Sequence, residues 1–507
     1  TSARWNLLKP ADWRFSIWRT MSPRCGPRPT AGRATALALL AGAADHGLSP
    51  DVYRAEDLAR RFANLQEASL VVADVAAADV ALSVSMLRYL RHLHLGRADP
   101  QALGFGVSAP LHDHDFAMSL QMAVEQSRVG DLVGEWAPQL ALYRGLRDAL
   151  ARYRGLAEDP GLREPLPFTA SVRPGDFSVG LRTLRHRLTA LGDLTADGPP
   201  AAASSLYDGA IVDAVRAFQA RHGLRVDGVI GRRTQEALRI PMEHRVRQIQ
   251  LSLERLRWLP DLADRFIAVN IPMFHLWGWD AIRPAGVPSI DMTVIVGRAL
   301  DTRTPVIIEE MRYVIFRPYW NIPSSIARGE ILPALARDPA YLEKHSMEIV
   351  LGQTDAARPV PTTPDAMAQV RSGALRLRQR PGPGNSLGLV KFIFPNDDNV
   401  YLHGTPAPQL FSRPRRDLSH GCVRVEQPQA LAQWVLADQP EWTGERIAAA
   451  MRGNEPRRVD LKRPIQVILF YLTAVVMPED GALHVADDIY GHDAALERAL
   501  ALPAITR

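Results

Sequence analysis

The sequence predicts a multidomain α+β protein: an all-α scaffold, a small three-helix module and a β-rich domain that carries an inserted subdomain. The first supporting observation is the length of 507 residues, which allows about three domains of ~150 residues. The second is apolar spacing of three and four residues from 34 to about 160, typical of helices. The third is a change to alternating apolar residues after 264, which indicates strands.

Composition and charge describe ordinary globular material. The 60 Lys and Arg residues against 55 Asp and Glu give a formal charge of +5, spread in short clusters. Such a balance suits an anionic polymer, substrate carboxylates or nucleic acid, so charge alone does not choose among them. No apolar run reaches the ~18 residues of a membrane-spanning helix. Cys25 and Cys422 are expected to be free thiols, because a disulfide would consume the one attractive nucleophile.

The N-terminal third divides into a leader and helices. Residues 1–33 are rich in Arg, Pro and Trp and are expected to be a weakly ordered leader. Met21–Ala44 imitates a signal peptide with its basic start and apolar run. The same stretch fits an amphipathic helix ending at Gly47, and this interpretation is favoured, with any export signal removed before Thr1. Residues 34–172 are predicted to form the helical scaffold domain.

The segment 173–243 has the pattern of a separate small module. One helix carries an apolar stripe that ends at Gly192, and a second buries residues such as Phe218. The run GLRVDGVIGRRTQEALRI then places Gly228 and Gly231 in tight turns before a last helix. A basic connecting helix within 244–263 leads to the β-rich part of the chain.

The β-rich domain is predicted over 264–455. Alternating apolar residues mark strands at 266–272, 291–297, 305–316, 389–394 and 400–404. Between them, 324–385 is helical and rich in Pro and Gly, and an insertion this long indicates a lid subdomain, not a structureless loop. Residues 456–507 are predicted to form a C-terminal hairpin and helix that pack on the scaffold or the catalytic domain.

The chemistry of the chain concentrates in 400–425, VYLHGTPAPQLFSRPRRDLSHGCVRV. Cys422 follows His403 by 19 residues, and if VYLHG and CVRV are neighbouring strands the two side chains come close together. The imidazole would then take the thiol proton and produce a thiolate at neutral pH. Thiolate attack on an amide or ester carbonyl gives an oxyanion, which needs preorganised donors.

One glycine of this stretch, Gly421, helps to present such donors. Gly421 permits a tight turn that points its own amide and that of Cys422 at one position. Because Gly404 has no side chain, a backbone carbonyl, such as that of Gly404 itself, is expected to orient the His403 ring. Arg424 could hold a substrate carboxylate or brace the loop. A lone Cys is more often a small buried hydrophobe, but SHGCVRV is poor core material, and no CxxC spacing supports zinc.

HGT followed by SHGCVRV closely resembles the catalytic motif of L,D-transpeptidases, the YkuD-type cysteine enzymes of the bacterial cell wall. AVRAFQARHGLRVDGVIGRRT resembles a three-helix peptidoglycan-binding domain. Further stretches, among them FRPYWNIPSSIARGEILP and GPGNSLGLVKFIFPN, are similar to the large Gram-negative members that combine both domains with a helical scaffold. The resemblance covers about residues 35–500.

The resemblance implies roles for individual residues. Cys422 becomes the nucleophile and His403 the base, with oxyanion donors in the backbone of His420, Gly421 and Cys422. Gly404 stands where the large members often carry Asp, whereas many smaller members have HGT. The remaining positions are expected to contact substrate, although packing is an equal alternative for the three aromatic-motif residues 319–321: Tyr401, Ser419, Arg424, Tyr319, Trp320 and Asn321.

By resemblance, the substrate is a peptidoglycan stem tetrapeptide containing meso-diaminopimelate, bound with its glycan strands in the periplasm. The expected reaction releases D-alanine and forms a 3→3 cross-link; water as acceptor would make the protein an L,D-carboxypeptidase, and a lipoprotein lysine an anchoring enzyme. Carbapenem β-lactams are expected inhibitors and other wall-synthesis proteins further partners, with no metal, organic cofactor or nucleic acid. A non-catalytic peptidoglycan-binding scaffold is the alternative of another class.

Overall fold

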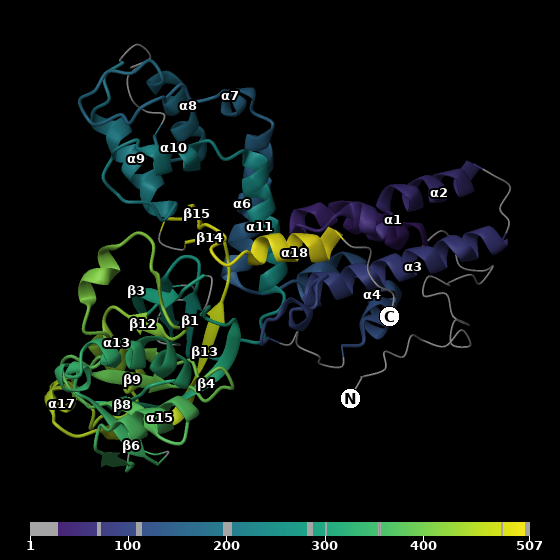
Figure 1. The fold of residues 1–507 in the computed structure, drawn as a ribbon. Coiled ribbons are helices and arrows are strands. Elements are labelled where there is room, and N and C mark those ends of the chain that lie inside the picture. Colours follow the sequence, from purple (N-terminus) through teal and green to yellow (C-terminus); the bar gives the residue numbers. More distant parts are fainter. Residues whose placement is uncertain are drawn as a thin grey trace. The chain divides into compact units, whose positions relative to one another are not determined.

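The computed structural model divides the chain into two compact units. Unit 1 comprises Thr1–Asp261 and Tyr471–Arg507, and unit 2 comprises Leu262–Phe470. The described residues are 29–67, 72–107, 114–195, 205–280, 287–299, 302–352, 354, 356–477 and 480–501. Most of the predicted leader, including Cys25, lies outside this set. The β-rich unit is therefore inserted into the helical unit, whose chain resumes after Phe470 (Figure 1).

The first part of unit 1 is helical, as predicted. Its helices are α1 (Pro29–Ala41), α2 (Ala55–Glu67), α3 (Val72–Leu95), α4 (Phe116–Glu125), α5 (Leu132–Trp136), α6 (Ala141–Ala157) and α7 (Pro160–Arg163). The apolar faces of α1 to α5 share one core, which includes Leu40, Leu58, Leu82, Met86, Leu90 and Leu120. The α3 side chains recur at helical spacing along this core, because residues three and four apart share a helix face.

The predicted three-helix module is also confirmed, as α8 (Leu181–Leu191), α9 (Gly209–Arg221) and α10 (Arg232–Leu238). Gly192 ends α8 with φ +86°, and Gly228 adopts φ +71° in the turn before α10. Both values lie in the left-handed region that glycine enters without steric cost. The fully buried Tyr207 donates its hydroxyl proton to the carbonyl of Gly228, which ties together the segments before and after α9.

The C-terminal segment corrects one prediction. The sequence analysis grouped 456–507 as one hairpin and helix, but Arg457–Phe470 forms β13 within the sheet of unit 2. The first half of β13 is polar and exposed and contains a register shift between Asp460 and Ile465, so its strand pattern was concealed. The remainder returns to unit 1 as the hairpin β14 (Ala474–Val476) and β15 (Leu483–Val485) and helix α18 (His492–Ala501).

Nine strands form the main sheet of unit 2 in the order β11-β3-β12-β10-β9-β4-β13-β1-β2. A further pairing of β2 with β3 closes the strands on themselves. The bounds are β1 (Phe266–Asn270), β2 (His275–Trp279), β3 (Ile290–Gly297), β4 (Ile307–Phe316), β9 (Val390–Ile393), β10 (Leu402–His403), β11 (Asp417–Ser419) and β12 (Val423–Val425). All five predicted strands are present, whereas β2, interrupted by Gly278, was not predicted.

The two faces of the sheet differ from each other in chemistry where β4, β9, β10 and β12 run side by side. Leu402 pairs with Phe392 on one side and Val423 on the other, and all three are fully buried. Helix α16 (Pro428–Val435), predicted from its apolar residues, packs against β3 and β9. The residues that alternate with this apolar set point to the opposite face.

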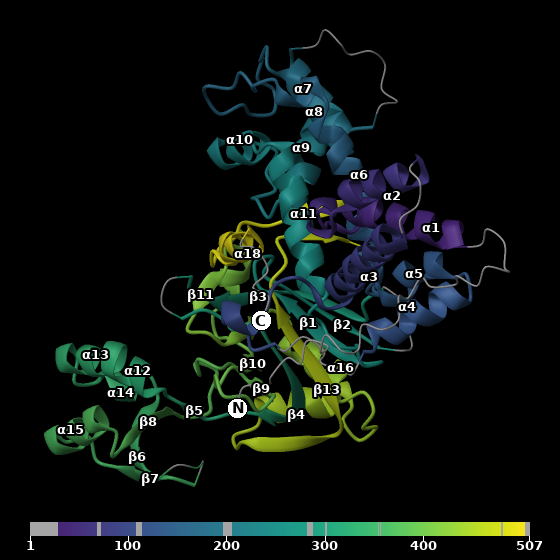
Figure 2. The same ribbon diagram turned by 90° about the vertical axis from the view of Figure 1, so that its right-hand side faces the viewer.

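The insertion is a small folded lobe with a sheet and core of its own (Figure 2). Its strands are β5 (Trp320–Asn321), β8 (Arg376–Gln379), β6 (Met347–Leu351) and β7 (Arg358–Val360), in that order across the sheet. Its helices are α12 (Ser324–Ile326), the π-helix η6 (Ala327–Ile331), α13 (Leu332–Arg337), α14 (Tyr341–Lys344) and α15 (Pro364–Ser372). They cover a core that includes Ile326, Ile331, Leu335, Ile349 and Leu377.

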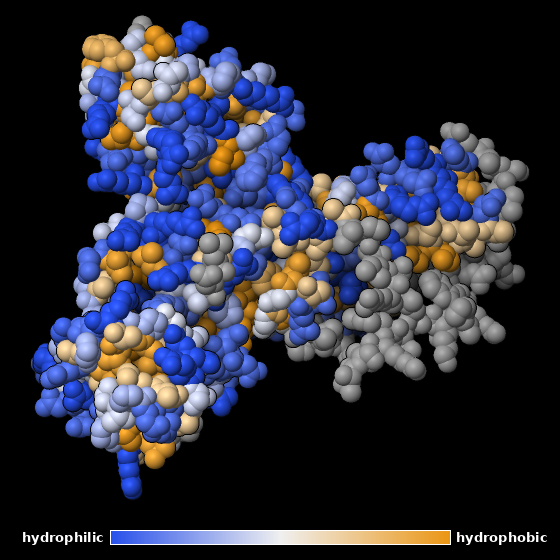
Figure 3. Space-filling model, in the orientation of Figure 1, coloured by the Kyte–Doolittle hydropathy of each residue, from blue (hydrophilic) through white to orange (hydrophobic). Residues whose placement is uncertain are grey.

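The next feature is the polarity of the described helices and of the drawn surface. Across the described ranges, no helix combines the length and apolar character needed to cross a bilayer. Hydrophilic residues cover most of the face drawn in Figure 3, with small apolar patches between them.

Candidate functional site

Strand register brings the two motif segments together. β10 and β12 are adjacent and parallel, with Leu402 level with Val423 and His403 level with Arg424. The backbone N–H of Val423 also donates to the carbonyl of Tyr401 at 3.1 Å, which places Cys422 level with Tyr401. Since side chains alternate along a strand, Tyr401, His403, Cys422 and Arg424 share one face of the sheet. The predicted neighbourhood of the two strands is confirmed.

His403 is held as a neutral ring with a defined tautomer. Its side chain is buried, with 4% exposed, and Nδ1 lies 2.6 Å from the carbonyl oxygen of Gly404. A carbonyl only accepts, so Nδ1 carries the proton and Nε2 is left with a free lone pair. Burial lowers the pKa of His403 to about 3, the charge of Arg424 acts in the same sense, and the Gly404 carbonyl opposes both. The orienting carbonyl is the one that the sequence suggested.

Cys422 is half-buried, and its hydrogen bonds run to its own neighbours on the strand and loop. The Tyr401 hydroxyl bonds the thiol, and the thiol points to the carbonyl of Asn399 with a sulfur–oxygen distance of 3.8 Å. Burial raises the pKa of the Cys422 thiol, although Tyr401 and the charges of Lys391 and Arg424 act in the opposite direction. The expected thiolate at neutral pH is therefore corrected: burial favours a neutral thiol beside a neutral imidazole.

The loop before Cys422 is fixed from within. Ser419 is 2% exposed, and its hydroxyl donates to the carbonyl of Cys422 at 2.5 Å and accepts from the N–H of Gly421 at 3.3 Å. Gly421 has φ +111°, as its predicted turn role requires. Ser419 was predicted to contact substrate; its burial and its two internal bonds instead assign it to the shape of the loop. The N–H of Gly421 is likewise engaged by Ser419 in this state.

Two threonines support the same loop from β3 and the segment after it. Thr304 is 1% exposed; its hydroxyl accepts from the N–H of Gly297 at 2.8 Å and donates to the carbonyl of Gly421 at 2.7 Å. Thr302 donates to the carbonyl of Ser419 at 3.1 Å. The carbonyls that face away from the site are thus paired, which fixes the peptide planes that carry the amides on the other side.

Arg424 supplies buried positive charge beside Cys422 and His403. No carboxylate among the described residues forms an ion pair with it, and its Nε is buried without a hydrogen-bond partner. Burial lowers its pKa, and the Cys422 thiol opposes that shift. A half-buried guanidinium without a counter-charge is suited to bind an anion, because two parallel N–H donors match a carboxylate.

Comparison with known proteins identifies the domain that carries this site. Residues 264–457 match the family model of the L,D-transpeptidase catalytic domain, YkuD. Residues 264–457 form an L,D-transpeptidase catalytic domain. Residues 25–150 match a "Scaffold domain" and residues 178–238 a "Putative peptidoglycan binding domain".

A relative carries the corresponding name. Over 252 residues the chain is 32% identical to a Haemophilus influenzae protein described as "Putative L,D-transpeptidase". The match covers 50% of this chain and 49% of the relative, so the chain spans about half the length of the protein it matches. The family resemblance read from the motifs is confirmed at the level of these domains.

The L,D-transpeptidase domain places the three motif residues 319–321 within its insertion. The Tyr319 ring lies under the guanidinium of Arg378 at 4.2 Å, and Arg378 is paired with Glu348 at 2.6 Å. Trp320 packs against the core of the insertion, and Asn321 is exposed on β5. Packing explains the two aromatic residues, and substrate contact by all three stays a prediction.

Several residues that shape the site were not singled out from the sequence. Asn396 donates to the carbonyls of Phe394 and Val400 at 2.7 Å each, and so fixes the loop that leads to Tyr401. Lys391 lies with Nζ 3.8 Å from the centre of the Tyr401 ring, on the same face as His403. Asn396 and Lys391 lie in the family-like stretch KFIFPN, and Thr304 in TPVI, so only the resemblance offered a signal for them.

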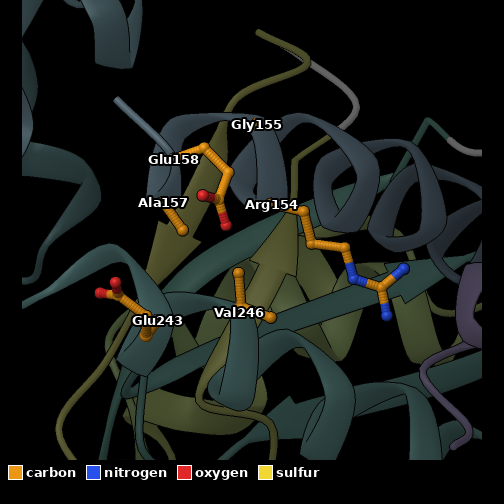
Figure 4. Close-up of a pocket in the computed structure, with 6 residues that line it drawn as sticks. All are labelled: Arg154, Gly155, Ala157, Glu158, Glu243 and Val246. Atoms are coloured by element: carbon orange, nitrogen blue, oxygen red, sulfur yellow. The ribbon is translucent and has the colours of Figure 1, made fainter. Parts of the chain in front are cut away.

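Unit 1 contains a separate hollow of about 480 Å³ between α6 and α11 (Met242–Leu256). Figure 4 shows its lining, with Arg154, Gly155, Ala157 and Glu158 from α6 and its end, and Glu243 and Val246 from α11. Arg163 lies 3.9 Å from the Glu158 carboxylate and 3.7 Å from that of Glu243, so both charges are matched. The hollow therefore has a structural explanation, and the L,D-transpeptidase domain holds the candidate active site.

Proposed function

We propose that the chain is a peptidoglycan L,D-transpeptidase that forms 3→3 cross-links through a thioester on Cys422. The observation that carries the proposal is the shared face on which the Cys422 thiol, the neutral His403 ring and the Arg424 guanidinium lie together, the last without a carboxylate partner among the described residues. A thiol that transfers acyl groups needs a base, oxyanion donors and a means of holding its substrate. The family of the domain and the peptidoglycan-binding match support peptidoglycan stem peptides as the substrate, and the periplasm is the proposed place of the reaction.

In the acylation step, Nε2 of His403 takes the thiol proton as sulfur attacks the carbonyl of meso-diaminopimelate at position three. A C–S bond forms, the C–N bond to the terminal D-alanine breaks, and the D-alanine amine leaves with the proton from His403. Because burial keeps both groups neutral at rest, proton transfer accompanies the attack instead of preceding it. The backbone amides of the His420–Cys422 loop would hold the oxyanion.

In the second step, the amine of a neighbouring diaminopimelate attacks the thioester. A C–N bond forms, the C–S bond breaks, and the amine proton passes through His403 back to sulfur. Arg424 would hold a carboxylate of the donor stem beside the reacting carbonyl. Water as acceptor would make the same site an L,D-carboxypeptidase, and a lipoprotein lysine would make it an anchoring enzyme.

The test is incubation of the purified chain with disaccharide tetrapeptide muropeptides, with products read by mass. Dimers that have lost one D-alanine support cross-linking. Monomers that have lost D-alanine without dimers support hydrolysis and replace the proposed acceptor by water. Unchanged tetrapeptides, together with binding to isolated sacculi, would overturn the enzymatic proposal in favour of a non-catalytic wall-binding scaffold. Acylation of Cys422 by a carbapenem is a second, independent readout of the same thiol.

A further inference from the structure

The insertion reaches the nucleophile loop through a hydrogen bond between a histidine and a carboxylate. Nε2 of His420, in the SHGC motif, lies 2.6 Å from the Glu330 carboxylate of η6. His420 directly precedes Gly421 and Cys422, whose peptide planes orient the amides of the loop. A contact on His420 therefore acts one residue away from the positive-φ turn on which the oxyanion donors depend.

The helix of the insertion is built to present Glu330 outward. Ile326 and Ala327, then Ile331 and Leu332, face the insertion core, while Arg328, Gly329 and Glu330 are exposed. The π-helical turn at Ala327–Ile331 occurs just before Pro333, whose nitrogen has no hydrogen to donate in a regular helical hydrogen bond. Single π-helical turns shift the phase of a helix and are frequent at functional sites.

The two ends of the insertion are attached to the rest of unit 2 very differently. At its base, Asn385 is 1% exposed and its amide donates to the carbonyls of Pro318 at 3.1 Å and Arg380 at 3.0 Å, joining both connecting segments. At its other attachment, the side chains of His420 and Glu330 are 28% and 51% exposed. The base is fixed by buried hydrogen bonds, whereas the Glu330 contact is accessible to water and easily exchanged.

We propose that Glu330 is a positioning residue, supplied by the insertion, that orients the His420–Cys422 loop when the insertion lies over it. The inference rests on the proposed function, because it assigns the loop its oxyanion role. Docking of the insertion and completion of the oxyanion donors are then one event. A substrate that holds the insertion over the loop thereby orders the oxyanion donors of that loop. When the insertion is open, the loop is less ordered.

The size of the effect follows from exposure. A partly exposed contact between a histidine and a carboxylate is worth little, so loss of Glu330 is expected to slow acylation by up to about fivefold and not to abolish it. The effect belongs to the acylation rate constant more than to substrate binding, since the loop amides are needed when the oxyanion forms. A fivefold change in KM with an unchanged kcat would contradict this assignment.

The experiment compares Glu330→Ala, the isosteric Glu330→Gln and the conservative Glu330→Asp with Glu343→Gln, an exposed carboxylate on α14 of the same insertion. Acylation by tetrapeptide muropeptides should slow in Glu330→Ala, recover in part in Glu330→Asp and stay unchanged in Glu343→Gln. Alkylation of Cys422 by iodoacetamide, which needs no oxyanion donors, should not slow in any variant. Equal slowing of acylation and alkylation would overturn the positioning role.

Hydrogen exchange separates this inference from the proposed function. Amides of 417–425 should exchange faster in Glu330→Ala and Glu330→Gln than in the parent chain, while those of the insertion core around Ile349 stay unchanged. Unchanged exchange in 417–425 would overturn the inference even if the chain is an active transpeptidase. If the parent chain releases no D-alanine, the proposed function fails, and faster exchange in the variants still supports the contact.

Discussion

Two sets of buried ionisable groups, one from each unit, respond to burial in opposite ways. In unit 1, Arg257, the residue directly after helix α11, is completely buried, yet its guanidinium pairs with Glu254 at 2.9 Å and donates to the hydroxyl of Tyr143 at 3.1 Å. Burial alone would lower the Arg257 pKa, but Tyr143 and Glu254 hold it above its ordinary value. In unit 2, burial is the largest influence. It raises the pKa of Cys422 and lowers that of His403, and both shifts favour the neutral form.

The difference lies in the partners and not in the depth of burial. In unit 1, Arg255 faces Asp493 and Arg257 faces Glu254, and the pair of Arg255 with Asp493 joins α11 to α18. Unit 2 gives His403 a neutral carbonyl and gives Cys422 a hydroxyl, and leaves Arg424 without a carboxylate among the described residues. Groups that are not paired with an opposite charge within the protein remain able to exchange protons with a substrate or to bind its charge.

The sharpest test of this contrast removes the thiol. Cys422→Ala should lower transfer by about 10⁴-fold or more, because the substitution removes the sulfur that is proposed to carry the acyl group. The unfolding midpoint should change little, since Ala preserves the buried volume closely. Turnover of muropeptides and thermal unfolding are the two measurements. Cys25→Ala is the matched control and should keep full activity; residual turnover in Cys422→Ala would refute the assigned nucleophile.

Removal of the imidazole is expected to have the next largest effect. His403→Gln keeps a polar side chain but has no nitrogen that takes a proton, so acylation should fall by roughly 10²–10⁴-fold. Single-turnover release of D-alanine measures the step directly. The thiol remains in place, so alkylation of Cys422 at high pH should persist. An acylation rate within twofold of the parent chain would exclude His403 as the base.

Unit 1 should respond in stability instead of activity. Asp493→Ala leaves the Arg255 guanidinium buried without its carboxylate, which should destabilise unit 1 by about 3–5 kcal/mol. Glu497→Ala breaks the Arg247 pair between the same two helices, α11 and α18, but that pair is largely exposed and should be worth no more than about 1 kcal/mol. Urea unfolding measures both. Equal losses would show that burial does not distinguish the two pairs.

The smallest expected change concerns the thiol pKa. Burial raises that pKa, so the rate of Cys422 alkylation should increase with pH to a midpoint above the ~8.5 of a free cysteine. The Tyr401 hydroxyl favours the thiolate, so Tyr401→Phe should move the midpoint to still higher pH and slow acylation by about tenfold. The alkylation rate measured against pH gives both values. A midpoint below that of free cysteine would contradict the neutral resting state.

Much of the fold could be predicted because its signals are local. Helical spacing through the scaffold, the glycine turns at Gly192 and Gly228, and alternation in five strands all act within a few residues. The two strands that were missed lacked such signals. β2 is interrupted by Gly278, and the exposed first half of β13 owes its place to pairing with β4, far away in sequence.

By itself, the sequence determined the family of the domain, the segments that carry the chemistry and the carbonyl that orients His403. These depend on residue identity and on spacing along short stretches. Only the tertiary structure decided the resting charge of the site, the role of Ser419 in shaping the loop before Cys422, and the contact between Glu330 and His420. The burial and the partners of each group depend on residues that lie far apart in the sequence, as Glu330 and His420 do. Those contacts form only when the sheet and its insertion have packed.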